Sequence, residues 1–409
     1  MQAILNQRLA LPVQVRAKPK AARWAVKLLF FLNGALFATW AARVPAVQAA
    51  RGLNNGELGL ALLAMATGAV FAMPLAGWLG ARFGSDKVCK TTALIYCVLL
   101  PGLALAPNFA LFALTLFGFG MVHGSLDVAM NAQAVAVEKR YQRPIMSSFH
   151  AFWSTGGLTG AAVGGLLAGQ GLKPLANFTI VAVLLGGAAL LTFPHLLDKA
   201  EQNAGAHTGI IAKRGPTPVF SWPTRGLLAL GLIALCIMVG EGAMADWSAV
   251  YLRNSLGTKE SLAAAGYAAF SIAMAGGRFL GDRLTADFGP MKLARAGALL
   301  AAGGLLLALV FHSAAVALIG FACVGLGYAT IVPMVFSAAG HRPGANSDIA
   351  VASVTTLGYL GFLIGPPLIG FVAEGLGLRC ALGIIVATSL VAAVLAPSLG
   401  SRLNSHPAV

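Results

Sequence analysis

Charged residues are scarce in this 409-residue chain, where Asp, Glu, Lys and Arg together make up only 10%. A soluble domain carries about 25%, whereas here 58% of the residues are hydrophobic and the mean hydropathy is +0.81. These proportions exclude a water-soluble fold. The net charge of +15 does not indicate nucleic-acid binding, because the basic residues flank apolar runs and are explained by insertion topology.

Signatures of enzymes and of bound cofactors are also lacking. The five cysteines form no CxxC pair and no zinc-like cluster with histidine, so we expect neither a metal nor a disulfide framework. No P-loop, HExxH or GxSxG motif is present, which argues against an enzyme, a cofactor and ATP as the energy source. An ion gradient remains, and protons are favoured because no sodium site is evident.

Twelve apolar runs of membrane-spanning length are present. A bilayer core needs about 20 residues of helix, and the runs meet this length in two groups of six. We therefore predict an all-α membrane protein with twelve transmembrane helices in two parallel six-helix halves. The spans are expected near residues 25–45, 57–80, 88–106, 109–137, 147–170, 175–197, 226–252, 261–283, 291–311, 314–339, 348–373 and 379–397.

Lys and Arg are distributed unequally over the loops. The side that holds both termini and the central linker has 22 of them, against 6 on the other side. The positive-inside rule then predicts a multi-pass membrane protein with both termini cytoplasmic. The expected parts are a tail (1–24), a first half (25–197), a linker (198–225), a second half (226–397) and a tail (398–409).

The two halves repeat short motifs at equivalent places, as expected for halves related by an axis along the membrane normal. Residues 33–40 read NGALFATW in span 1, and residues 241–247 read EGAMADW in span 7. After span 2, residues 77–84 read GWLGARFG, and after span 8, residues 277–283 read GRFLGDR. We call the last two segments the first and second glycine turns.

The glycine turns resemble the signature of the major facilitator superfamily, a glycine-rich turn with an acid and an arginine after the second helix of each half. The resemblance implies that the second turn, with Asp282 and Arg283, latches the halves together on the cytoplasmic side. The first turn has Arg82 but carries Ala81 where the family usually has aspartate. Either that latch is weakened or Asp86 substitutes for the missing acid.

Two further segments, residues 149–153 (FHAFW) and 241–247, resemble the fucose-permease-like branch of this superfamily, within a group of bacterial inner-membrane proteins that includes the rhizopine transporter MosC. The resemblance implies a small polar solute, such as a sugar or cyclitol derivative, moved with protons. The branch pattern includes a carboxylate on the first helix, whereas span 1 here has Asn33 and Thr39 but no acid.

Ionisable side chains at membrane depth cost about 2.5–3.5 kcal/mol each on insertion scales, which makes them functional candidates. In span 4, the spacing of His123, Asp127 and Asn131 places them on one helical stripe. We predict that Asp127 and His123 carry protons in a central cavity; the alternative is a His–Asp pair that only joins helices. Glu241 in span 7 is the second predicted coupling carboxylate, and its alternative is a hydrogen bond to a neighbouring helix.

Other charged residues are predicted to form gates. Asp246 shares a helical stripe with Arg253 and lies at the depth of Arg43 in the equivalent span 1, which predicts an outer salt bridge. The predicted inner-gate residues are Arg82, Asp282 and Arg283.

Polar and aromatic side chains within the spans are predicted to contact the solute, because rings with polar tips stack on ring-shaped solutes and bond their hydroxyls. Ordinary packing is the alternative for each, and interfacial anchoring for His150. Pro333 and the pair Pro366–Pro367 are predicted to kink or interrupt spans 10 and 11. The predicted solute contacts are Asn33, Trp40, Asn131, His150, Trp153, Tyr267, Tyr328 and Tyr359.

The sequence thus predicts a monomeric secondary transporter whose partners are a small solute, protons and the bilayer, working by alternating access in the direction of uptake. Proton-driven efflux of a metabolite or drug-like compound is the alternative, although the arginine typical of drug antiporters is absent from span 4. A non-transporting sensor with the same fold is a further alternative. Asp127 and Glu241 argue against it, since a scaffold has no reason to bear their insertion cost.

Overall fold

The computed structural model describes residues 19–53, 55–204, 225–258, 260–342 and 345–400, and these are almost entirely helical. The predicted linker and both tails lie largely outside these ranges. The first half consists of α2 (Pro19–Arg51), α3 (Asn55–Phe83), α4 (Ser85–Leu105), α5 (Phe109–Tyr141), α6 (Met146–Gly169) and α7 (Pro174–Thr192), followed by η1 (Phe193–His195) and the short α8 (Lys199–Ala204).

The second half repeats the pattern with two modifications, a π-helical end on its first helix and a break in its fourth span. Its elements are α9 (Arg225–Val250), η2 (Tyr251–Ser255), α10 (Glu260–Phe288), α11 (Pro290–Val310), α12 (Ala314–Tyr328), α13 (Ile331–Gly340), α14 (Ser347–Leu376), α15 (Leu378–Leu395) and η3 (Ala396–Gly400).

The expected all-helical fold in two six-helix halves is confirmed. Within the described residues, ten spans are long and apolar enough to cross a membrane, with α12 and α13 counted together as one span. The helices α6 and α10 have sufficient length but fall outside this set. They pack against each other across the two halves, where polar side chains do not meet lipid.

Of the two proline sites, only one coincides with a helix break. Span 10 divides at Ala329 and Thr330, just before Pro333, whose ring nitrogen cannot donate the backbone hydrogen bond of a continuous helix. In contrast, α14 remains one helix through Pro366 and Pro367. Span 11 is therefore not interrupted, and a kink at these prolines stays a prediction.

Glycines bring helices of one half into direct backbone contact, as shown by the pair α2 and α6. A Cβ added at Gly156 would collide with the backbone carbonyl of Phe31, and one at Gly160 with that of Ala35. Such small-residue contacts let membrane helices associate by close packing. The high glycine content is thus explained by packing.

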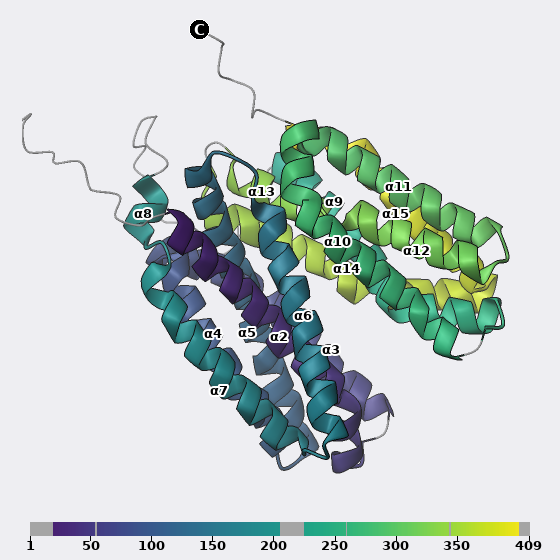
Figure 1. The fold of residues 1–409 in the computed structure, drawn as a ribbon, viewed down its shortest axis with the longest axis horizontal. Helices are drawn as coiled ribbons and strands as arrows, with labels where there is room; N and C mark the ends of the chain where they lie inside the picture. Colours follow the sequence, from purple (N-terminus) through teal and green to yellow (C-terminus); the bar gives the residue numbers. More distant parts are fainter. Residues whose placement is uncertain (1–18, 54, 205–224, 259, 343–344, 401–409) are drawn as a thin grey trace, which may run out of the picture.

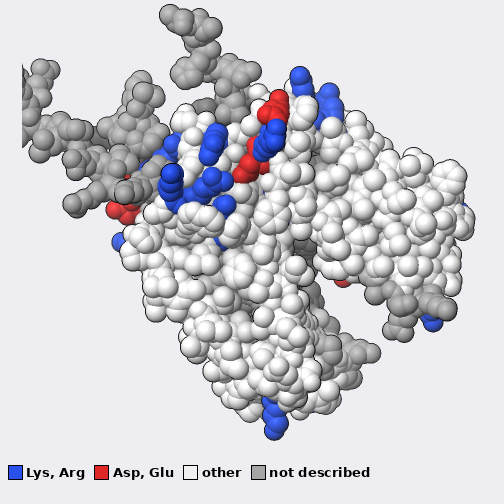
Figure 2. All heavy atoms as spheres, in the orientation of Figure 1, with Lys and Arg blue, Asp and Glu red and all other residues white. Residues whose placement is uncertain are grey.

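The two halves converge at one end of the molecule and diverge at the other (Figure 1). We call the end at which α2 and α9 begin and α8 lies the linker end, and the opposite end the distal end. The halves meet through α3 with α14, α6 with α10, and α5 with α13 and α14. In the space-filling view a hollow separates the halves on the distal side (Figure 2), so the protein is closed at the linker end and open at the distal end.

Candidate functional site

The polar stripe of α5 faces the second half at mid-depth. His123 and Asp127 are 8% and 7% exposed, and Asn131 is fully buried. Asn131 donates its side-chain amide to the Asp127 carbonyl at 2.9 Å and to Asp127 Oδ1 at 3.3 Å. From α14, Tyr359 lies beside the Asp127 side chain. Asp127 thus belongs to the first half but faces a residue of the second.

His123 and Asp127 share the stripe but have different partners. The ring of His123 stacks on Phe37 and its Nδ1 lies 3.0 Å from the hydroxyl of Tyr96. Among the described residues no hydrogen bond or ion pair joins His123 to Asp127, so the alternative of a His–Asp pair does not hold. His150 instead reaches the stripe, with its Nε2 3.2 Å from Asn131 Oδ1.

The second cross-half contact centres on Arg278 of α10, which is 5% exposed. Its guanidinium donates to the hydroxyl of Ser154 on α6 at 2.7 Å. It also lies 3.9 Å from Glu241 Oε1 on α9 and 6.0 Å from the centre of the Trp153 ring. Glu241 therefore has a neighbouring cation on α10, and its role as a coupling carboxylate stays a prediction.

Arg278 was missed as a site residue, although a signal for it exists in the sequence. It is an arginine inside a predicted span, 261–283, and ionisable residues at that depth are functional candidates. Because it follows Gly277, the sequence pattern assigned it to the second glycine turn and not to the membrane-spanning part of the helix. In the structure α10 continues to Phe288, which places Arg278 about 15 Å inside the helix at about 1.5 Å per residue.

Some of the predicted solute-contacting residues lie beside the cross-half contacts or are exposed, and others are buried inside one half. Trp153 donates its indole N–H to Asn33 Oδ1 at 3.1 Å, beside Arg278, and Tyr267 is 45% exposed. Trp40 and Tyr328 are buried inside their own halves and do not face the space between the halves. The sequence predicts their helices but not the direction in which each side chain points. Trp40 is packed among Phe112, Phe119 and Phe178, and Tyr328 bonds Ser389 inside the second half.

The predicted outer salt bridge is not formed in this conformation. Arg43 is buried and donates to the Leu172 carbonyl at 2.6 Å, while Arg253 donates to the Thr258 carbonyl at 2.8 Å. No ion pair within the described residues includes Asp246, which is exposed. Because the distal end is open, the pairing stays a prediction for the state in which that end closes.

At the linker end, the first turn of α6 is capped by two carboxylates. The first amides of a helix lack partners within it. Glu138 of α5 accepts from the N–H groups of Ile145 and Met146 at 2.8 and 2.9 Å. Asp282 of α10 accepts from the Ser148 N–H at 3.0 Å. The second glycine turn therefore binds a helix N-terminus of the opposite half, and the gating role of Asp282 stays a prediction.

The basic partner of this latch is not the predicted one. Arg23 of α2 lies 3.6 Å from Asp282 and donates to the Ser148 hydroxyl at 3.2 Å. Arg283 instead points outward and pairs with Asp287 on its own helix at 3.7 Å. Arg82 is also exposed and lies over aromatic rings of its own helix. The predicted gating roles of Arg82 and Arg283 are thus not seen in this state.

A further cross-half contact was not predicted. The Ser337 hydroxyl of α13 donates to Glu138, the same carboxylate that caps α6. His341 Nδ1 lies 3.9 Å from it. Burial lowers the pKa of the His341 ring, which follows α13, below its ordinary value. The ring is therefore neutral at pH 7, and Ser337 makes the cross-half bond to Glu138.

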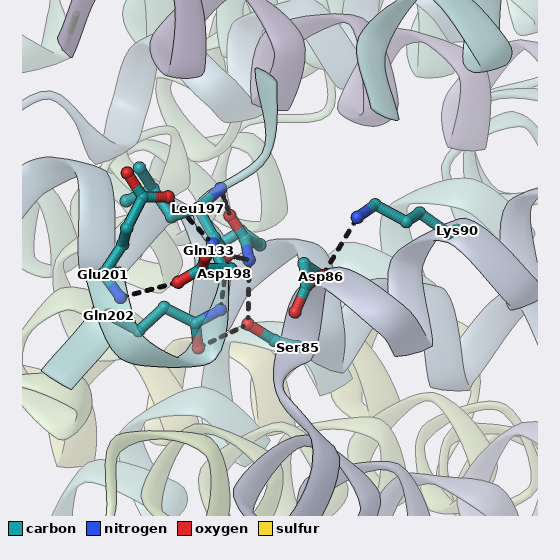
Figure 3. Close-up of polar contacts among 8 residues, drawn as sticks. All are labelled: Ser85, Asp86, Lys90, Gln133, Leu197, Asp198, Glu201 and Gln202. Carbon is teal, nitrogen blue, oxygen red and sulfur yellow. Dashed lines mark hydrogen bonds and ion pairs between the residues drawn. The ribbon is translucent and has the colours of Figure 1, made fainter. Parts of the chain in front are cut away.

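The first glycine turn uses an acid from the other half. A Cβ added at Gly80 would lie 2.8 Å from Asp348 Oδ1 in the first turn of α14. Asp86, the predicted substitute, pairs with Lys90 on its own helix at 3.0 Å (Figure 3). The expectation for Asp86 is therefore wrong, and Asp348 occupies the contact.

The segment around α8 is hydrogen-bonded to the first glycine turn and to α5. Gln133 donates to the Leu197 carbonyl at 2.7 Å and accepts from its N–H at 3.1 Å, while Ser85 bonds Gln202 of α8 at 3.1 Å (Figure 3). Lys199 donates to the Arg82 carbonyl at the end of α3 at 2.7 Å. The chain that leaves the first half is thus bonded to the first glycine turn.

Comparisons with known proteins confirm the resemblance seen in the glycine turns. The sequence model of the Major Facilitator Superfamily matches residues 27–348. An uncharacterized MFS-type transporter of Yersinia pestis is 38% identical over 372 residues, which cover 91% of this chain and 94% of that protein. The membrane protein MosC of Rhizobium meliloti is 37% identical over 383 residues, covering 94% and 91%.

Among solved structures, the fucose:proton symporter FucP of E. coli matches with a TM-score of 0.69. The match covers 92% of this chain and 98% of that one at 19% sequence identity. At this identity the likeness concerns the fold alone.

Proposed function

Because the chain belongs to the major facilitator superfamily, a family of transporters and not of enzymes, we propose that it takes up a small polar solute together with protons. The solute class is a sugar, a cyclitol or a derivative of one. The protein works as a monomer by alternating access between two halves, residues 25–197 and 226–397. The linker (198–225) and the tails (1–24 and 398–409) lie at the cytoplasmic face of a bacterial inner membrane, where the basic residues concentrate.

The observation that carries this proposal is the pair of polar contacts between the halves at mid-depth. Asp127 of the first half faces Tyr359 of the second, and Arg278 of the second half bonds Ser154 of the first. Both contacts lie roughly 15–25 Å inside the helices at about 1.5 Å per residue, close to the bilayer midplane. Transporters of this architecture bind solute and coupling ion at this depth, between their repeats.

Asp127 is suited to carry the proton. Among the described residues no cation pairs with it within 4.0 Å, so a proton is the means of neutralising it at membrane depth. Its neighbour Tyr359 belongs to the opposite half, so a movement of one half against the other changes the surroundings of the carboxylate. Protonation and conformation are coupled through that contact.

Glu241 and Arg278 supply the polar part of the solute site. The carboxylate accepts hydrogen bonds and the guanidinium donates up to five, so together they match vicinal hydroxyl groups. Their separation of 3.9 Å exceeds a hydrogen bond, which leaves donor and acceptor capacity for a solute. Trp153 beside Arg278 provides a ring face for stacking. The resemblance of residues 149–153 and 241–247 to the fucose-permease-like branch supports the choice of a sugar-like solute.

The test uses purified protein in proteoliposomes that enclose a pH-sensitive dye. Sugars, cyclitols and amino sugars are added outside one at a time, and we expect the lumen to acidify with at least one of them. Asp127→Asn should abolish solute accumulation but retain exchange of labelled solute across the membrane. Asp287→Asn is the matched control, because Asp287 is exposed and, in the part of the chain that the structure describes, pairs only with Arg283 of its own helix.

Two outcomes would contradict separate parts of the proposal. Accumulation that persists in the Asp127→Asn variant would remove Asp127 as the coupling acid. If folded protein shows no solute-dependent pH change with any of these compounds, uptake of a sugar-like solute is refuted and efflux of another metabolite takes its place.

A further inference from the structure

A basic cavity lies at the linker end of the first half, away from the central site. Its volume is about 250 Å³. It opens to the surface and is bordered by the first two turns of α2 and the segment that joins α5 to α6. The lining residues are Lys20, Arg23, Trp24, Lys27, Tyr141 and Arg143.

Four of these six residues are cations, and aromatic rings hold three of them in place. Arg23 and Arg143 lie 5.3 and 5.6 Å from the centre of the Tyr141 ring. Lys27 lies 4.8 Å from the Trp24 ring and 4.6 Å from the ring of Phe152 on α6. Such contacts fix the direction of long basic side chains. The positive charges therefore converge on one cavity.

Little negative charge offsets these cations. Arg23 pairs with Asp282 at 3.6 Å, but in the described part of the chain no acid lies within 4.0 Å of Lys20, Lys27 or Arg143. The Nε of Arg23 is buried and has no hydrogen-bond partner among the described residues. The space-filling view shows Lys and Arg gathered at this end of the first half (Figure 2). The cavity therefore carries an excess of positive charge that suits an anion.

The position of the cavity relative to the bilayer indicates where the anion comes from. Trp24 is 61% exposed, and α2 becomes a membrane-spanning segment from Lys20 onward. Lys27 lies about 10 Å deeper than Lys20 at about 1.5 Å per residue. Tryptophan and basic residues at such a boundary are typical of the headgroup region, and basic pockets between helices there bind anionic lipid headgroups.

We propose that this cavity binds the phosphate of an anionic phospholipid, such as phosphatidylglycerol, from the leaflet at the linker end. Lys20 and Arg143 contact the phosphate from the solvent side, and Lys27 contacts it from the membrane side. The acyl chains lie along the exposed face of Trp24. The lipid binds next to Arg23, which also contacts Asp282 and Ser148 of the cross-half latch.

The experiment measures lipid binding to the purified full-length protein by native mass spectrometry in detergent. The probes are phosphatidylglycerol and phosphatidylcholine of identical acyl chains, and inorganic phosphate is added as a soluble competitor. The test variant is Lys20→Gln with Arg143→Gln, which leaves Arg23 intact. The control variant is Lys87→Gln with Lys292→Gln, because both residues are exposed basic residues outside the cavity.

We expect the wild-type protein and the control variant to retain one phosphatidylglycerol in preference to phosphatidylcholine. The test variant should bind it about 30-fold more weakly, which corresponds to ~2 kcal/mol at about 1 kcal/mol for each charge removed. Equal retention of both lipids, or equal weakening in both variants, would overturn the site. Displacement of the lipid by millimolar phosphate would overturn its assignment to a lipid and indicate a site for free phosphate.

Discussion

The hydrogen bond between Ser337 and Glu138 offers a direct test of how the linker end is held closed. Glu138 keeps its two backbone partners, Ile145 and Met146, whatever happens to the serine. Replacing Ser337 by alanine therefore removes the cross-half bond without stranding the carboxylate. We predict that Ser337→Ala shifts the protein toward the state that is open at the linker end.

The size of the shift follows from the kind of bond that is lost. A hydrogen bond to a charged group contributes about 1.5–3 kcal/mol. The lower value applies here because Ser337 is only half-buried and water replaces part of the lost contact. A loss of about 1.5 kcal/mol from the closed state alone changes the ratio of the two states roughly tenfold.

The two states can be counted by the distance between spin labels placed at the linker ends of the halves, at Lys87 and Lys292 in a background without other cysteines. Both positions are exposed. The control is Ser353→Ala, because the Ser353 hydroxyl bonds the Ile349 carbonyl of its own helix at 2.8 Å. If Ser337→Ala changes the ratio of states by less than twofold, or no more than Ser353→Ala does, the cross-half role of Glu138 is refuted.

Two further predictions concern the solute site and the helix packing. Arg278→Lys keeps the charge but loses the fork that reaches both Ser154 and Glu241, so the initial rate of solute uptake should fall at least tenfold; a fall of less than twofold would contradict the role of Arg278. Gly156→Leu should lower the Tm in scanning fluorimetry by several degrees, because overpacking against the Phe31 carbonyl costs about 1–3 kcal/mol. The matched control, Gly165→Leu, meets nothing within 4 Å of the added Cβ and should leave the Tm nearly unchanged.

The helices and the polar stripe of α5 could be predicted from the sequence because their signals are local. An apolar run of bilayer length specifies a span, and a spacing of four residues places His123, Asp127 and Asn131 on one face. The break before Pro333 is equally local, since proline removes a donor wherever it stands in a helix. Such features depend on residues close in the chain.

The direction in which a helix face points could not be predicted in the same way. Trp40 and Tyr328 look like suitable cavity residues, but their helices turn them toward the interior of their own halves. Arg253 lies in a π-helical segment, which changes the angular spacing on which its pairing with Asp246 was predicted. Rotation of a helix is determined by its neighbours, and a single sequence does not contain that information.

The two glycine turns make the same kind of contact, but the acid lies on opposite helices in the two. Each turn packs a glycine against the first turn of a helix in the other half, Gly281 against Ser147 and Gly80 against Asp348. At the second turn the acid is on the glycine helix, where Asp282 accepts from the α6 backbone. At the first turn position 81 is alanine, and the carboxylate is that of Asp348 on the opposite helix.

The helix that carries the acid determines whether each glycine turn forms a hydrogen bond between the halves. Asp282 has both an N–H donor and Arg23 as partners. Asp348 lies in the first turn of its own helix, where the helix dipole favours a negative charge, but its Oδ1 is buried with no hydrogen-bond partner in the described part of the chain. The carboxylate at the first turn therefore contributes packing without a cross-half hydrogen bond. The α6–α10 latch and the Glu138–Ser337 bond are accordingly polar contacts between the halves that must break when the linker end opens.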